Sequence, residues 1–196
     1  MATRRRKKYE FKPDPKGTNF LKKLYMTKLQ RLQLLKWGSY AVLCVLLLVI
    51  QDVMLSRVRF FGATTDLAVC IIFLIAIYEG TETGSLFALI ASTVYWFSGS
   101  APGTYVIAIM TALSIGINLF RQMFWRRSFG STALCTSVAI IAYEMIIFVV
   151  GIFMGRTIWV RAGVFLTTGI SSSIVMLALY PLVRAIAKIG GNTWKE

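Results

Sequence analysis

Apolar residues in this chain fall in long blocks that are separated by short polar segments. The blocks cover approximately residues 37–55, 83–97, 104–120, 131–153 and 160–183, and one more begins between residues 60 and 66 and ends near residue 78. Within the blocks the apolar positions follow no period of 2 or 3.6 residues, which is typical of helices that cross a bilayer. The pattern predicts an all-α integral membrane protein with six transmembrane helices in residues 37–190, followed by a C-terminal tail at 191–196.

Residues 61–97 must contain a break. One straight helix over this range would be about 55 Å long, whereas the hydrocarbon core of a bilayer is about 30 Å thick. The only polar stretch in the range is Glu79-Gly80-Thr81-Glu82-Thr83-Gly84. We therefore expect two short spans joined by a tight turn here, since a single span would move every later loop to the opposite side of the membrane.

The chain before the first span is basic and polar. Residues 1–17 are rich in lysine, arginine and proline, and we expect a disordered cytoplasmic tail. Residues 18–36 place most of their leucines on one half of a helical wheel, which favours an amphipathic helix at the membrane interface. Lys28, Arg31 and Lys36 depart from this pattern, because they lie on the apolar half.

The composition favours a membrane protein, and the position of the positive charge indicates which partner it would bind. Charged residues make up 15% of the chain and hydrophobic residues 57%, against about 25% charged residues in a typical soluble domain. The net charge is +14, and more than half of the 22 Lys and Arg lie in residues 1–36. A basic block before an apolar run favours anionic lipid headgroups as partners, and we expect no nucleic-acid partner. The candidate membrane-surface residues of this basic arm are Arg4, Arg5, Arg6, Lys7, Lys8, Lys22 and Lys23.

The remaining basic residues predict the orientation. If the chain crosses the membrane six times, all Lys and Arg except Arg57, Arg59, Arg156 and Arg161 lie on the same side as the N-terminus. Cytoplasmic loops carry the excess of basic residues in membrane proteins. Both termini are therefore expected to be cytoplasmic.

The chain offers little for catalysis or metal binding. It contains no His, which excludes histidine-based catalytic triads, dyads and metal sites. Cys44, Cys70 and Cys135 lie far apart inside apolar blocks, where cysteine usually behaves as a small hydrophobe. There is also no glycine-rich phosphate loop. We expect no catalytic residue, no metal, no cofactor and no enzymatic activity.

Glu144 is the most unusual residue in the apolar blocks, because it lies near the middle of the fifth one. A charged carboxylate at the centre of a bilayer costs at least about 2.5–3.5 kcal/mol. It must therefore face protein or a cavity, or stay neutral. Two interpretations are open: a polar contact inside the bundle or with a partner helix, or a protonated side chain satisfied by a neighbouring hydroxyl or carbonyl.

Other polar residues lie at the predicted span ends. Gln51 and Asp52 precede two arginines, which favours local ion pairing, with a ligand or partner contact as the alternative. Asp66 follows two threonines and is expected to cap a helix N-terminus. Glu79 and Glu82 flank the predicted turn, where we expect solvated side chains, with docking to a basic partner segment as the alternative.

Small residues recur every fourth position around that turn. The series is Ala76, Gly80, Gly84, Ala88 and Ser92. In lipid, this spacing lets helix backbones approach closely, and packing replaces the hydrophobic effect as the force between helices. The series predicts a close-packing face on the third span, within the bundle or toward a partner helix.

The order of these features resembles MreD, the small membrane subunit of the bacterial rod-shape machinery. The likeness covers about residues 37–190 and includes "LLLVIQDVML", "ATTDL", "YEGTETGSLFALIASTVYWFSGSAPGTY" and "LALYPLVRAI". Several positions depart from the family pattern. Thr65 stands where the family usually has proline, Ala88 and Ser92 replace later glycines, and Trp96 stands at or near an expected aspartate.

The resemblance implies a non-enzymatic scaffold of the cell-elongation complex, which makes lateral-wall peptidoglycan, in the bacterial cell membrane. Its implied partners are an MreC-like protein, a RodA-like glycosyltransferase and a penicillin-binding transpeptidase. The family is also similar to the six-helix S-components of energy-coupling-factor vitamin transporters, which implies an S-component-like bundle. A substrate-binding S-component is the alternative function, in which Trp96 would line the ligand site. The bulky first span, "YAVLCVLLLVI", counts against it, because small residues at four-residue steps would be expected there.

Overall fold

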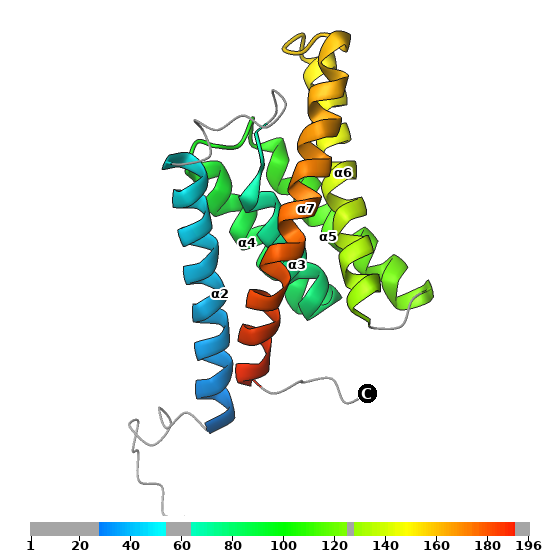
Figure 1. The fold of residues 1–196 in the computed structure, drawn as a ribbon. Helices are drawn as coiled ribbons and strands as arrows, with labels where there is room; N and C mark the ends of the chain where they lie inside the picture. Colours follow the sequence, from blue (N-terminus) through cyan, green and yellow to red (C-terminus); the bar gives the residue numbers. More distant parts are fainter. Residues whose placement is uncertain (1–27, 54–63, 125–127, 191–196) are drawn as a thin grey trace, which may run out of the picture.

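The computed structural model describes residues 28–53, 64–124 and 128–190, and every element in these ranges is a helix. Six α-helices follow one another within these ranges, with two short 3₁₀ helices beside the last (Figure 1). They are α2 (Lys28–Val53), α3 (Leu67–Glu79), α4 (Thr81–Phe97), α5 (Tyr105–Phe124), α6 (Phe129–Phe153), η2 (Trp159–Arg161), α7 (Ala162–Ala187) and η3 (Lys188–Gly190). The expected tails at 1–17 and 191–196 and the basic arm residues lie outside the described ranges.

Helix length and composition are consistent with a membrane protein. Four segments are long and apolar enough to cross a bilayer: Gln30–Val53, Tyr105–Met123, Phe129–Phe153 and Trp159–Ala187. The two other helices are short, with 13 residues in α3 and 17 in α4, which correspond to about 20 Å and 26 Å. In the described ranges, the all-helical bundle thus has four candidate spans and one short helical hairpin.

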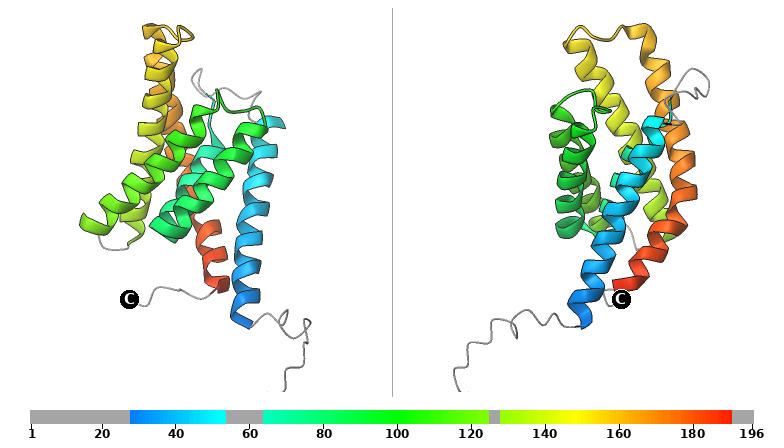
Figure 2. Two further views of the ribbon diagram at one scale, coloured as in Figure 1. Left: turned by 180° about the vertical axis from the view of Figure 1, so that it is seen from behind. Right: turned by 90° about the vertical axis from the view of Figure 1, so that its left-hand side faces the viewer.

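The short helix α3 forms the centre of the bundle. Every residue from Leu67 to Ile77 is at most 6% exposed. Helices α2, α4, α5, α6 and α7 all contact α3, and the views in Figures 1 and 2 show it enclosed among them. A helix that is hydrophobic on all sides is stable in this position because no face of it meets water.

The expected break between the second and third apolar blocks is found at Gly80. Its φ is 99°, in a region of backbone conformation that only glycine adopts readily. The Gly80 N–H donates to the carbonyl of Ala76, 3.2 Å away, and the Gly80 carbonyl accepts from the N–H of Gly84 at 2.9 Å. One residue therefore ends α3 and starts α4.

The series of small residues forms the contact between α3 and α4. A Cβ atom at Gly84 would overlap the carbonyl oxygen of Ala76, so the two backbones touch there. Ala88 and Ser92 are fully buried on the same face of α4. Gly84 thus lets the backbones of α3 and α4 touch, and the face of α4 that carries Ala88 and Ser92 lies inside the bundle.

The two ends of the bundle differ in shape. The start of α2, the turn at Gly80 and the end of α7 lie at one end, and η3 packs against α2 there (Figure 1). At the other end, the α6–α7 hairpin extends beyond the remaining helices (Figure 2). The segment from Lys28 to Lys36, assigned above to an interfacial helix, continues into the first span without a break in α2.

The contact at Gly84 yields a first prediction. Gly84→Ala should destabilise the bundle by about 1–3 kcal/mol, because the added methyl forces the α3 and α4 backbones apart. Gly116→Ala is the matched control, since a Cβ there meets nothing within 4 Å, and it should not destabilise. Thermal unfolding in detergent measures both. Equal unfolding midpoints for the two variants would contradict this packing.

Candidate functional site

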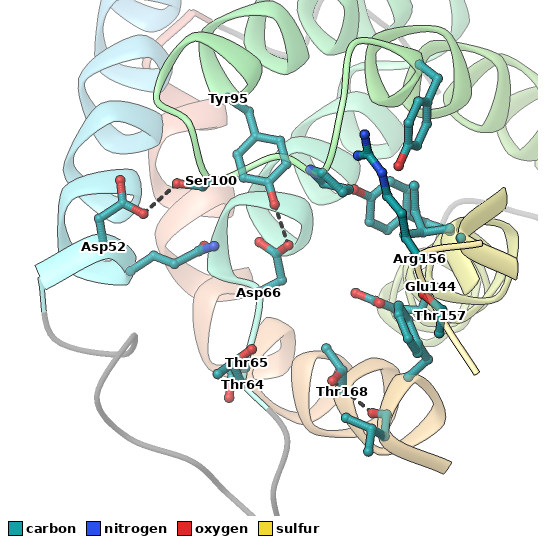
Figure 3. Close-up of a pocket in the computed structure, with 18 residues that line it drawn as sticks. Asp52, Thr64, Thr65, Asp66, Tyr95, Ser100, Glu144, Arg156, Thr157 and Thr168 are labelled. Carbon is teal, nitrogen blue, oxygen red and sulfur yellow. Dashed lines mark hydrogen bonds between the residues drawn. The ribbon is translucent and has the colours of Figure 1, made fainter. Parts of the chain in front are cut away.

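A cavity of about 520 Å³ lies at the end of the bundle where the α6–α7 hairpin extends (Figure 3). It is bordered by the end of α2, the segment before α3, the end of α4, the loop before α5 and its first residue, the second half of α6, the α6–α7 connection and the first turns of α7. The polar and aromatic residues that line it are Gln51, Asp52, Thr64, Thr65, Asp66, Tyr95, Ser100, Tyr105, Tyr143, Glu144, Arg156, Thr157, Phe165 and Thr168. Its walls therefore combine charged, hydroxyl and aromatic side chains from all parts of the described chain.

Asp66 is fixed at the floor of the cavity by the start of α3. Its carboxylate accepts a hydrogen bond from the N–H of Val69 at 3.3 Å, which confirms the predicted N-cap. The hydroxyl of Tyr95 donates to the other carboxylate oxygen at 2.7 Å. The backbone N–H of Asp66 donates to the hydroxyl oxygen of Ser172 at 3.0 Å. Helices α3, α4 and α7 thus meet at this one residue.

Gln51 and Asp52 have separate roles at the end of α2. The side-chain oxygen of Gln51 accepts from the N–H of Ala68 at 2.8 Å, so Gln51 is a second cap of α3 rather than part of an ion pair. Asp52 accepts a hydrogen bond from the hydroxyl of Ser100, which ties α2 to the loop before α5 (Figure 3). The two arginines expected to pair with them lie outside the described residues.

Glu144 lies on α6 at the wall of this cavity. The side chain is only 6% exposed, and within the described ranges its carboxyl group makes no hydrogen bond or ion pair. The carboxyl group with which it interacts electrostatically is that of Asp66. Asp66 and Glu144 therefore face the same cavity. Asp66 is held by contacts with three helices, whereas Glu144 has no hydrogen-bond or ion-pair partner among the described residues.

Aromatic rings and one cation complete the walls. Tyr95, Tyr105 and Tyr143 line the cavity, together with Phe165 of α7. Arg156 is exposed and borders the cavity from the α6–α7 connection. At the end of α4, the aromatic ring that lines the cavity belongs to Tyr95, the neighbour of Trp96. Trp96, which the S-component alternative placed in the ligand wall, instead packs on Phe97 with ring centroids 4.7 Å apart.

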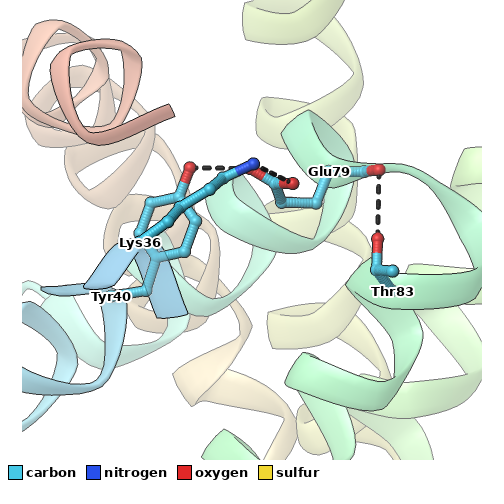
Figure 4. Close-up of polar contacts among 4 residues, drawn as sticks. All are labelled: Lys36, Tyr40, Glu79 and Thr83. Carbon is cyan, nitrogen blue, oxygen red and sulfur yellow. Dashed lines mark hydrogen bonds and ion pairs between the residues drawn. The ribbon is translucent and has the colours of Figure 1, made fainter. Parts of the chain in front are cut away.

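A second polar cluster lies at the opposite end of α3. The ammonium group of Lys36 is 2.6 Å from one carboxylate oxygen of Glu79, and the hydroxyl of Tyr40 donates to the other at 2.7 Å (Figure 4). All three side chains are buried. The expectation of a solvated Glu79 is therefore wrong, whereas Glu82 is exposed as expected. The sequence contained one sign of this buried pair. Lys36 lies on the apolar half of its helix, and a lysine in that position needs a buried partner.

Metal-binding residues do not gather in the described chain. In the ranges 28–53, 64–124 and 128–190, no three His, Cys, Asp or Glu residues lie close enough to hold a metal ion. The three cysteines are unpaired and buried, each on a different helix. The chemistry of the site is therefore that of carboxyl, guanidinium, hydroxyl and aromatic groups.

Comparisons of the chain with family models, with curated proteins and with solved structures give no match.

The buried ion pair yields a second prediction. Lys36→Met should destabilise the protein by about 3–5 kcal/mol, because it leaves the buried Glu79 carboxylate without its cation. The double variant Lys36→Met/Glu79→Gln should recover part of this loss. Glu82→Gln, an exposed neighbour, should change stability by less than about 0.5 kcal/mol. Thermal unfolding in detergent would refute the pairing if Lys36→Met were as stable as Glu82→Gln.

Proposed function

We propose that this chain is a non-enzymatic membrane scaffold subunit of the bacterial cell-elongation complex, similar to MreD. It binds an MreC-like protein, a RodA-like glycosyltransferase and a penicillin-binding transpeptidase within the cell membrane. The observation that supports action by binding is the filled centre of the bundle. The resemblance in sequence supplies the particular partners.

The filled centre favours a protein that acts by binding. Conduction or transport needs a path for its substrate, and in the described residues the path along the bundle axis is occupied by α3. Leu67 to Ile77 are buried over the full length of this helix. The cavity ends at Asp66, where the buried part of α3 begins. A bundle of this kind can offer its outer surfaces to other helices while keeping its own packing.

Those outer surfaces are long apolar faces. On α2, Val42, Val45 and Val49 are exposed and recur at helical spacing. On α7, Ile170 and Ile174 form a similar face. In a bilayer such faces contact either lipid or a partner helix, so a scaffold of this family would receive the spans of its partners here.

The proposal includes six spans with both termini in the cytoplasm. In this arrangement α3 and α4 are two short spans, and α3 needs no match to the bilayer thickness because protein surrounds it. Arg184 and Lys188 then lie on the cytoplasmic side with the start of α2, and Arg156 and Arg161 lie outside. This distribution supports the orientation by the positive-inside rule.

A second candidate function is favoured by the cavity itself. A substrate-binding subunit of an energy-coupling-factor transporter would bind a small molecule in the membrane and leave transport to other subunits. A volume of about 520 Å³ lies within the range of about 300–1,000 Å³ typical of small-molecule sites. A filled centre is equally compatible with such a receptor, so the partner proteins distinguish the two candidates.

The orientation can be tested by cysteine labelling, because the three native cysteines are buried. Thr104→Cys and Glu82→Cys place an exposed thiol at opposite ends of the bundle. A membrane-impermeant maleimide should label Thr104→Cys in intact cells, and Glu82→Cys only after permeabilisation. The unsubstituted chain controls for background. Labelling of Glu82→Cys in intact cells would contradict the proposed orientation.

Photocrosslinking in native membranes tests the partners. A photoreactive residue at exposed Val45 or Ile174 should capture the MreC-like protein or the RodA-like and transpeptidase pair. Met176, fully buried on the same helix as Ile174, is the matched control and should capture none of them. Recovery of paired ATPases with a coupling membrane protein would instead establish the transporter candidate. Capture of neither set would contradict both.

A further inference from the structure

We propose that the cavity between Asp66, Glu144 and Tyr143 is a binding site for a small organic ammonium ion. The inference goes beyond the scaffold function and does not depend on it. For the receptor candidate it names the chemical class of the substrate. It rests on the charge of the cavity, on the unpartnered carboxyl group and on the aromatic walls.

The charge of the cavity favours a cation. Among the described residues, its lining carries the carboxyl groups of Asp52, Asp66 and Glu144 and the guanidinium of Arg156. Arg156 is exposed at the border, where solvent screens its charge. Two of the acidic groups lie deeper, at the start of α3 and on α6. A positively charged ligand would lower the repulsion between them, and an anionic ligand would raise it.

Glu144 identifies where the positive charge would lie. Asp66 already accepts hydrogen bonds from Tyr95 and Val69, so its carboxylate is partly satisfied. Glu144 is buried to more than nine-tenths and has no partner in the described chain. Burial of an acidic group without a partner is unfavourable, and a cation in the cavity would remove that cost. The cationic centre of the ligand is therefore placed beside Glu144.

The aromatic rings decide the kind of cation. Tyr95, Tyr105 and Tyr143 come from three different helices and line the same space. The faces of aromatic rings attract ammonium groups, and cages of such rings are a common means of binding quaternary amines. A metal ion would instead need several oxygen ligands at 2.0–2.6 Å, roughly, from converging carboxylates, and no such group occurs in the described ranges.

The proposal is tested with the full-length chain purified in detergent, using choline and benzyltrimethylammonium as probes. Both chlorides should raise the unfolding midpoint in a saturable manner, because a ligand that binds only the folded state stabilises it. Sodium chloride at the same concentration controls for ionic strength. The neutral choline isostere 3,3-dimethylbutan-1-ol controls for shape. Neither control should stabilise the protein.

Charge variants locate the site. Glu144→Gln should weaken binding of the cationic probes at least about tenfold, since it removes the negative charge beside the ligand. Arg156→Gln should tighten binding about two- to fivefold at low salt, since it removes a like charge from the border. Glu82→Gln, an exposed carboxyl group at the other end of the bundle, should leave affinity unchanged. Glu144→Gln breaks no hydrogen bond within the described chain, so its unfolding midpoint without ligand reports whether it folds.

Several results would overturn the proposal. They are stabilisation by neither ammonium probe, equal stabilisation by the neutral isostere, or unchanged affinity in a folded Glu144→Gln protein. Each of these outcomes is independent of the photocrosslinking result. Failure of the ammonium site would therefore leave the scaffold function standing, and failure of the scaffold function would leave the ammonium site standing.

Discussion

Enclosure of α3 is the constraint on which the rest of the structure depends. Protein surrounds this helix on every side, so the polar groups at its ends must find partners inside the bundle. At the N-terminal end, Asp66 and Gln51 accept from the first backbone N–H groups. At the C-terminal end, the carbonyl of Ala76 accepts from Gly80 and from the side-chain amide of Asn118 at 3.0 Å. Glu79 is paired with Lys36 and Tyr40. These buried polar residues therefore satisfy the polar groups at the two ends of α3.

This constraint also explains why polar clusters occur at both ends of the bundle and why they differ. The cluster at Glu79 is closed, because a cation and a hydroxyl satisfy both carboxylate oxygens. The cluster around Asp66 is open, because it borders the cavity at the end where α6 and α7 extend beyond the other helices (Figure 2). Glu144 faces that cavity without a partner among the described residues. The two ends of α3 therefore differ: the carboxylate at one end is fully paired, and the carboxyl groups at the other end border open space.

Features of the fold and of the candidate site could be predicted from the sequence where they depend on residues close together in the chain. The break at Gly80 followed from helix length against bilayer thickness, and the cap at Asp66 followed from its position before an apolar run. Glu144 was singled out by the cost of burying its charge. The Lys36–Glu79 pair was missed because its members lie 43 positions apart and each was assigned to a surface. The cavity could not be predicted, because its walls come from five helices and their connections and no local pattern records that convergence.

Labelling by photoactivatable lipids tests the central claim, the enclosure of α3, most directly. The protein is reconstituted in a bilayer that contains lipids with a reactive group in the acyl chain, and labelled peptides are identified by mass spectrometry. We predict adducts on the exposed faces of α2 and α7, at residues such as Val45 and Ile174, and none between Leu67 and Ile77. Adducts within α3 at levels similar to those on α2 would contradict the enclosed position of this helix and the account built on it.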